Sequence, residues 1–314
     1  MTPSGLAPHD PAPQPHGAAG DDAAATPAPN PLPRQNEHKA ADAPDTLSPR
    51  TEPHATGPHV VGAHAANRLP RPVPDASVLT LDDPGPLLAN GSSADVFALD
   101  DDYVLRRYRG NHDAAHEARI LRHVAAHGFP VPAVYLSEGP NLLMERLHGP
   151  TLLQALAAGE VAIGDAAQIL VDLHEQLHAI PPAPDAPVDE SQWPFVPTGP
   201  VVVHLDLHPG NVVLSDTRGP TLVDWANARA ATAELDVALS ALILAEVAVD
   251  AGGDYSHAAR ALLAAFLVRS AVSPIDALEE ATRTRRADPG LVTGERELVE
   301  EAGELVRDLI RVAS

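Results

Sequence analysis

The sequence predicts an α+β fold in two parts, a small antiparallel sheet with one helix and then a mainly helical part. Short apolar runs separated by turn residues fill residues 87–108, as in a meander of strands. Residues 113–126 then show the apolar spacing of a helix, and helical periodicity dominates from residue 151 onward. A proline-rich tail precedes both parts.

The N-terminal quarter has the composition of a disordered segment. Residues 1–75 hold 16 of the 33 prolines and no Phe, Trp or Tyr. Such a segment cannot bury enough apolar surface to offset the entropy lost on ordering it, so we expect a disordered tail rich in Pro, Ala and His. Its irregularly spaced histidines are a weak metal-binding candidate. A tethering linker or a mis-called start codon is the simpler interpretation of the tail.

Charge and hydropathy limit the partners of the chain. The net charge is −22, of which the tail contributes only −3, so the rest should repel nucleic acid and anionic membranes. No apolar run approaches the ~18–20 residues of a membrane span, and the N-terminus lacks the pattern of a secretory signal. We therefore expect a cytoplasmic protein that binds neither nucleic acid nor membrane. The sequence does not indicate an oligomeric state.

Two residue types restrict the catalytic groups. The chain has no cysteine, which excludes disulfides and thiol nucleophiles. Lys39 is the only lysine and lies in the tail. Any catalytic cation of the folded part must therefore be an arginine.

Residues 76–147 are expected to form the sheet and its helix. The helix, residues 113–126, should stop before Gly128 and Pro130, which cannot continue it. Two strands are expected within residues 87–99, around a turn at Asn90–Ala94. Three more are expected at residues 103–108, 134–136 and 142–145.

Residues 148–314 are expected to form the helical part. Two short apolar strands, 201–205 and 221–224, should bracket Asn211. A five-stranded sheet with one helix, then a short linker, then a helical lobe with two short strands is the order of a bilobal protein-kinase-like fold. Helices are expected at residues 151–158, 166–180, 234–249, 255–272, 274–283 and 295–313.

The reacting groups are concentrated in the run His204-Leu205-Asp206-Leu207-His208-Pro209-Gly210-Asn211 and in Asp224. Asp206 can accept a proton from an attacking hydroxyl, or orient it, and Asn211 offers an uncharged oxygen to Mg²⁺. Asp224 ends an apolar strand, where a second, ionised ligand would lie. An isolated Asp in a Pro-Gly loop is more often a turn residue. The three together, at strand ends in the helical part, indicate a reacting centre.

This run resembles the catalytic loop of the aminoglycoside phosphotransferase family, which shares the kinase fold. Members typically have His-Gly-Asp-Leu-x-Pro-x-Asn followed by Ile/Val-Asp-Trp/Phe, and the resemblance covers about residues 88–272. It implies ATP and Mg²⁺ as cofactors and a small-molecule hydroxyl as acceptor, with Asp206 as base and Asn211 and Asp224 as metal ligands. Leu205 replaces the usual glycine, which we expect to change packing beside Asp206 rather than the reacting groups.

The same resemblance gives supporting roles to three residues. His204 is expected to brace the loop by a hydrogen bond to backbone rather than to transfer protons. His208 could touch phosphate or substrate, or could occupy a surface turn. Asp236 is expected to cap the next helix or brace the loop.

The nucleotide side is less typical of a kinase. The turn Asn90–Ala94 lies where kinases place a glycine-rich loop, yet it contains a single glycine, Gly91, and alone would indicate a hairpin. The hydroxyl and amide groups of Ser92 and Ser93 could reach the β- and γ-phosphates. The Glu145 carbonyl and the Leu147 amide would bond the adenine edge.

An arginine takes the place of the phosphate-binding lysine. Val96 would cover the adenine. Strand alternation puts Val104 and Arg106 on one face, so Val104 can line the base while Arg106 reaches the phosphates. Arg107 is the alternative if the strand is shifted by one residue. Glu117, on the following helix, is the expected ion-pair partner.

Two other functions compete with small-molecule phosphorylation. The single glycine and the arginine are compatible with a catalytically weak, nucleotide-binding pseudokinase or scaffold. A protein-serine/threonine kinase is less expected, because no activation segment ending in an Ala-Pro-Glu-like motif follows Asp224. The sequence does not identify the molecule that accepts the phosphoryl group. Arg283, Arg285 and Arg286 could contact an anionic substrate, although a solvated helix end is the simpler interpretation.

Overall fold

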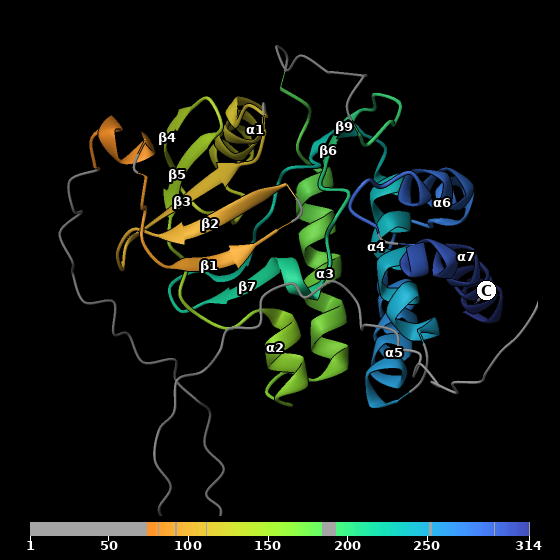
Figure 1. Cartoon of the computed structure of the whole chain (residues 1–314). Helices are drawn as coiled ribbons and strands as arrows, with labels where there is room; N and C mark the ends of the chain where they lie inside the picture. The colour runs from red at the N-terminus through yellow and green to blue at the C-terminus, as the bar shows by residue number, and fades with distance from the viewer. Residues whose placement is uncertain are drawn as a thin grey trace, which may run out of the picture. The chain divides into compact units, whose positions relative to one another are not determined.

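A computed structural model of the chain describes most of residues 74–313 (Figure 1). The residues it describes are 74–80, 82–91, 93–110, 112–183, 193–250, 253–291 and 293–313. All of them belong to one compact unit, Arg34–Ser314. The predicted tail, residues 1–75, lies outside the described residues except for its last two. Ser92 of the predicted nucleotide turn also lies outside them.

The first lobe is the predicted five-stranded antiparallel sheet, in the order β1-β2-β3-β5-β4 (Figure 1). The central strand β3 is buried on both faces because alternate residues enter two apolar clusters. Val104 joins the main core, and Leu105 packs with Leu79 of the short helix η1 (Ala76–Thr80). The strands are β1 (Leu87–Asn90), β2 (Ala94–Ala98), β3 (Tyr103–Tyr108), β4 (Val134–Glu138) and β5 (Asn141–Glu145).

One helix accompanies this sheet, as the sequence predicted. Helix α1 (Ala115–Ala126) lies beside β4 and begins two residues later than expected. Asp113 Oδ1 accepts a hydrogen bond of 2.8 Å from the Ala115 amide, which satisfies one of the free N–H groups of the first turn. The helix ends before Gly128, whose φ of 82° is the left-handed conformation that stops a helix.

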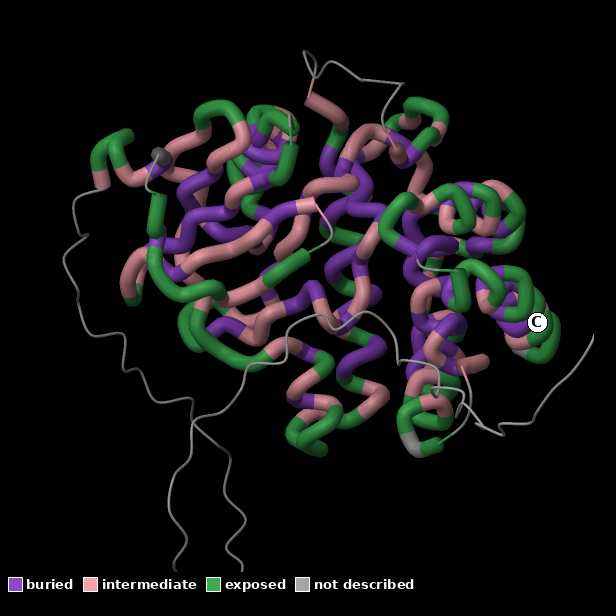
Figure 2. The backbone as a smooth tube through the Cα atoms, viewed as in Figure 1, coloured by how far each residue is buried: buried purple, intermediate pink, exposed green. Residues whose placement is uncertain are grey.

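The second lobe is built around α4 (Ala233–Val249). This helix is apolar on nearly every side because α3, α5, α6 and α7 all pack against it (Figures 1 and 2). Its two buried acids, Asp236 and Glu246, are therefore exceptions that need charged or hydrogen-bonding partners. The other helices are α2 (Leu152–Ala157), α3 (Ile163–His178), α5 (Asp254–Arg269), α6 (Leu278–Arg286) and α7 (Thr293–Ala313).

Several of these helices differ from the prediction in extent: α5 ends at Arg269, three residues earlier than expected, and α7 begins two residues earlier, at Thr293. Helix α3 begins at Ile163, three residues earlier than expected, because Ala162 already provides its extended N-cap. Helix α6 begins at Leu278 rather than at residue 274, since the preceding turn is the 3₁₀ helix η3 (Ile275–Ala277). None of the helices in the described residues is long and apolar enough to cross a membrane.

Two short antiparallel strand pairs, of which β7–β8 is a hairpin, flank the catalytic loop. The predicted strand at residues 201–205 is β6 (Val201–Val203), and it pairs with β9 (Arg229–Ala231). The predicted strand at 221–224 belongs to β8 (Gly219–Leu222), which pairs with β7 (Val212–Ser215). Both predicted strands end early, because Leu205 and Asp224 have φ of 63° and 64°, which no strand accommodates. The partner strands β7 and β9 were not predicted.

Candidate active site

A buried carboxylate on α4 anchors the start of the catalytic loop. Asp236 Oδ1 accepts a hydrogen bond of 2.7 Å from the Leu205 amide, and both its oxygens lie 3.2 Å from the His204 amide. His178 of α3 donates to Asp236 Oδ2 at 2.8 Å. Burial alone would raise the pKa of Asp236, but His178, His174 and the Leu205 amide hold it well below its usual range. Asp236 is thus ionised and accepts hydrogen bonds from two backbone amides of the loop, which braces the start of the loop.

The residue next to the predicted base has an unusual backbone conformation. Leu205 has φ of 63° and a fully packed side chain. The left-handed region costs an L-residue about 1–2 kcal/mol and favours glycine. Leu205 therefore differs from the family's glycine in backbone strain, whereas the sequence had suggested a difference in packing alone. The bond from its amide to Asp236 helps to hold this conformation.

Asp206 and Asn211 lie against each other, as the spacing of the loop suggested. Asn211 Nδ2 donates to the Asp206 carbonyl at 2.9 Å and to Asp206 Oδ2 at 3.0 Å. These bonds commit the amide nitrogen and leave the Asn211 amide oxygen to face other groups. The Asp206 side chain keeps 21% of its surface exposed. Burial of the carboxylate raises the pKa of Asp206 to about 7, against the opposing charge of Arg285.

Of the two histidines of the loop, His204 is buried and His208 is half-buried. His204 Nε2 donates to the Val223 carbonyl at 3.1 Å, and its ring packs edge-on against Trp225. His208 Nδ1 accepts from the Gly210 amide at 3.1 Å, so it stabilises the turn, and its Nε2 lies 3.8 Å from Asp206 Oδ1. Burial lowers the pKa of His208 to about 4, which keeps the ring neutral near pH 7. His208 is therefore a turn residue, with 12% of its side chain exposed.

Asp224 is connected to both the loop and the sheet. The Val223 amide donates to the Asn211 carbonyl at 2.9 Å, which fixes the strand end beside the loop. Arg106 Nη2 of β3 donates to Asp224 Oδ1 at 2.6 Å. Burial alone would raise the pKa of Asp224, but the Arg106 guanidinium holds it below its usual range. The Asp224 carboxylate and the Asn211 amide oxygen are both donors of the kind that hard divalent cations prefer.

Arg106, and not Arg107, faces the catalytic loop. Arg106 is buried, and its Nε lies 3.1 Å from Glu117 Oε2 on α1. Arg107 points to the other side of the sheet, where it bonds Asn141 Oδ1 at 2.8 Å and the Leu79 carbonyl at 3.1 Å. Of the two candidates that the sequence left open, the structure thus places Arg106 on the side of Asp224. Val96 lies opposite Arg106 in the β2–β3 register, on the face it shares with Val104.

The turn between β1 and β2 is clamped by an arginine that the sequence analysis did not identify. Arg109 Nη1 donates to the Gly91 carbonyl at 2.9 Å, and Nη2 donates to Asn90 Oδ1 at 2.9 Å. The same guanidinium forms an ion pair with Asp95, and the Arg109 amide donates to the Ser93 carbonyl at 2.9 Å. This turn is thus held in shape by side-chain bonds rather than left flexible by glycines.

At the end of β5, the Glu145 side chain makes its bonds within the fold. The Glu145 carboxylate is occupied elsewhere, since it accepts from the Ala133 amide at 3.0 Å and from Arg218 Nη2 at 2.8 Å. The adenine contacts expected of the Glu145 carbonyl and the Leu147 amide remain a prediction.

A second arginine, Arg285, acts electrostatically on the base, whereas the sequence had offered it only as a substrate contact or part of a solvated helix end. Arg285 of α6 makes a bidentate pair with Glu246 of α4, at 2.9 Å from Nε and 3.0 Å from Nη2, and its Nη1 bonds Asp288 at 2.9 Å. Its side chain is only 16% exposed, and its charge acts on both Asp206 and His208. The suggestion of a solvated helix end is therefore wrong for Arg285. No local signal could have paired it with an acid 39 positions away.

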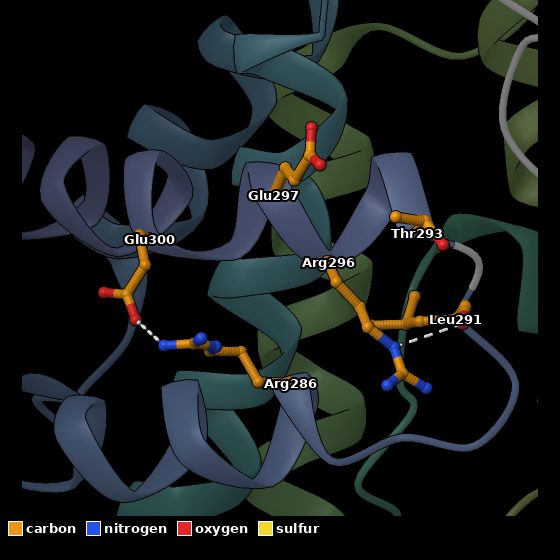
Figure 3. Close-up of a pocket in the computed structure, with 6 residues that line it drawn as sticks. All are labelled: Arg286, Leu291, Thr293, Arg296, Glu297 and Glu300. Atoms are coloured by element: carbon orange, nitrogen blue, oxygen red, sulfur yellow. Dashed lines mark hydrogen bonds and ion pairs between the residues drawn. The ribbon is translucent and has the colours of Figure 1, made fainter. Parts of the chain in front are cut away.

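A groove between α6 and α7 lies apart from these residues in the fold. It has a volume of about 700 Å³, and Figure 3 shows Arg286 crossing it to Glu300 and Arg296 bonding the Leu291 carbonyl. Of the residues singled out in the sequence, only Arg286, a possible substrate contact, lines it. The lining residues are Arg286, Leu291, Thr293, Arg296, Glu297 and Glu300.

The fold and the loop define a bilobal kinase-like protein with an Asp-Asn-Asp constellation between its lobes. The sequence profile of the phosphotransferase enzyme family matches residues 85–196 and 188–270. The chain belongs to this family. No curated protein matches the sequence.

Several solved structures are similar to this chain. Aminoglycoside phosphotransferase APH(4)-Ia has a TM-score of 0.46 and 16% identity, over 73% of this chain and 93% of that one. The gentamicin complex of APH(2")-IIa has a TM-score of 0.41 and 14% identity, over 76% and 91%. ADP-bound APH(2'')-Ib has a TM-score of 0.40 and 12% identity, over 75% and 99%.

Proposed function

We propose that the protein transfers the γ-phosphoryl group of ATP to a hydroxyl group of a small molecule in the cytoplasm. One observation carries the proposal. Asn211 bonds Asp206 directly, the Asn211 carbonyl accepts from the amide of Val223 next to Asp224, and Arg106 reaches Asp224 from the sheet at 2.6 Å. A base, two oxygen ligands and a phosphate-binding cation therefore meet where the two lobes face each other, as phosphoryl transfer requires.

Asp206 is the proposed base. Its carboxylate is partly exposed, so it can reach an acceptor hydroxyl, and the Asn211 amide fixes its orientation. Asp206 would align the attacking oxygen with the γ-phosphorus and take up its proton as the bond forms. His204 and Asp236 hold the loop rather than exchange protons, since both are buried against backbone groups.

Asn211 and Asp224 are the proposed Mg²⁺ ligands. The Asn211 nitrogen is committed to Asp206, which directs the amide oxygen toward a cation, and the low pKa keeps Asp224 ionised. Bound Mg²⁺ would supply charge neutralisation for the phosphates. The chain's own part is to hold these two oxygens together through the bond from the Val223 amide to the Asn211 carbonyl.

The nucleotide would occupy the sheet side. Arg106 would bind phosphate oxygens as a bidentate donor, a geometry that a guanidinium suits. The turn clamped by Arg109 would cover the phosphates with Gly91 and the Ser93 groups, with Ser92 as a further predicted contact. The face that Val96 and Val104 share would line the base.

A panel of small-molecule hydroxyl compounds, scored by ADP release in the presence of Mg-ATP, tests this proposal. The wild-type chain should consume ATP with at least one acceptor. Asp206→Asn should lose about 10²–10⁴-fold of that rate, because a positioned base contributes that much. Equal turnover by Asp206→Asn would refute the assignment of the base.

A pseudokinase or scaffold is the second candidate, and the bond from Arg106 to Asp224 Oδ1 favours it. The guanidinium bonds an Asp224 oxygen that would bind Mg²⁺, so Arg106 and Mg²⁺ would compete for the same atom. Calorimetry separates the candidates. Mg-ATP binding without ATP consumption across the whole panel would support the scaffold.

A further inference from the structure

Tyr108 is the last residue of β3, two positions after Arg106 and on the same face of the strand. Its hydroxyl donates to Glu117 Oε2 at 2.6 Å. Both residues are buried. A short bond to a buried carboxylate is among the stronger hydrogen bonds of a protein. Neither the sequence motifs nor the family resemblance had assigned Tyr108 a role.

Arg106 forms the ion pair with Glu117 that its position predicts, but no aligned hydrogen bond to it. Its Nε lies 3.1 Å from Glu117 Oε2, yet the N–H group is not directed at any acceptor in the described structure. The same Oε2 atom already accepts from Tyr108. Instead, the guanidinium carbon lies 5.2 Å from the centre of the Tyr108 ring, within the range of a cation–π contact.

Glu117 also connects the sheet to the metal-binding segment. Its Oε1 accepts from the Trp225 amide at 3.2 Å, and Trp225 directly follows Asp224. Arg106 Nη2 reaches Asp224 itself at 2.6 Å. Tyr108 therefore contacts both groups that link the two lobes at this point, the carboxylate through its hydroxyl and the guanidinium through its ring.

We propose that Tyr108 is a positioning residue for the nucleotide site, which allows an arginine to replace the phosphate-binding lysine. A lysine at position 106 would donate directly to Glu117. In this chain the Tyr108 hydroxyl makes that bond, and its ring supports the guanidinium so that Nη2 points toward Asp224 and the phosphates. The inference rests on the proposed function only in taking the ligand to be a nucleotide.

Titration of the full chain with fluorescent N-methylanthraniloyl-ATP and Mg²⁺ tests the inference in a four-protein cycle. The proteins are the wild type, Tyr108→Phe, Arg106→Lys and the double variant. Tyr108→Phe keeps the ring, so in the arginine background we expect about tenfold weaker binding from loss of a hydrogen bond to a charged group. In the lysine background we expect less than about twofold, because the ammonium bonds Glu117 itself.

Tyr103→Phe is the matched control. Tyr103 is another buried tyrosine of β3, but it belongs to the separate cluster on the opposite face of the sheet. Its hydroxyl should not affect nucleotide binding. Thermal melting of each variant reports stability separately. The second variant is Tyr108→Met, because a flexible methionine can fill the core but has neither the hydroxyl nor the ring. It should also weaken nucleotide binding in the arginine background.

Two results would overturn the inference. One is wild-type affinity in Tyr108→Phe or Tyr108→Met. The other is an equal loss in both backgrounds, which would mean that Tyr108 only stabilises the fold. Nucleotide binding without turnover would sink the proposed function and leave this inference standing, so the two failures are distinguishable.

Discussion

Asp236→Asn should loosen the catalytic loop without touching a reacting group. Asp236 accepts hydrogen bonds from His178 at 2.8 Å, from the Leu205 amide at 2.7 Å and from the His204 amide at 3.2 Å. An asparagine keeps one oxygen, and its NH₂ group must face one of these donors. At least one bond to a buried charge is lost and a donor is left unpaired.

The expected cost is about 3–5 kcal/mol in the free energy of unfolding, the range found when one partner of a buried charged pair is removed. Urea unfolding followed by circular dichroism measures it. The turnover number should also fall, by up to about 10²-fold, because a displacement of about 1 Å at Asp206 has that effect. The KM for ATP should change little, since Asp236 does not face the sheet.

Asp172→Asn is the control for this prediction. Asp172 is an exposed acid on α3, bonded only to Gln168 among the described contacts, and its loss should stay within about 0.5 kcal/mol. A cost below about 1 kcal/mol for Asp236→Asn, with normal turnover, would refute the bracing role.

Three further predictions follow from buried or clamped groups. Burial lowers the pKa of His174 to about 4, below the unfolded value of about 6.5. Between those pH values the unfolded chain binds more protons, so the free energy of unfolding should fall as the pH drops from 6.5 to 4. Unfolding curves of His174→Gln should show a smaller fall. At Leu205, the φ of 63° predicts that Leu205→Gly has a free energy of unfolding about 1 kcal/mol higher than that of Leu205→Ala in urea titrations, the reverse of the usual order. A more stable alanine variant would contradict the backbone strain. Arg109→Met should weaken nucleotide binding by up to about fivefold, because it frees the turn. The melting temperature should change little, since the Arg109–Asp95 pair is half exposed. Arg311→Met, on the exposed end of α7, is the control, and a nucleotide affinity of Arg109→Met equal to that of the wild type would exclude the clamp.

The catalytic loop could be predicted because its information is local. Asp206 and Asn211 are five positions apart, and their contact follows from one short loop. The alternation of β3 likewise placed Val104 and Arg106 on one face. The five-stranded sheet and the order of the helices followed from periodicity in the same way, and the structure confirms them.

The roles that were missed depend on contacts between distant segments. Arg285 meets Glu246 39 positions away, and Arg109 meets Gly91 18 positions away. Tyr108 contacts a helix that begins seven residues later, but a tyrosine at a strand end indicates core packing in most sheets. Strand β9 is only three residues long, with two alanines, and has no pattern to recognise.

The most direct test of phosphoryl transfer follows a radiolabel from the γ position of ATP onto an acceptor. With an acceptor found by the ADP-release panel, the wild-type chain should place the label on an acceptor hydroxyl, and Asp206→Asn should reduce that transfer by at least about 10²-fold. Transfer by Asp206→Asn at the wild-type rate, or label released only as inorganic phosphate, would contradict the account.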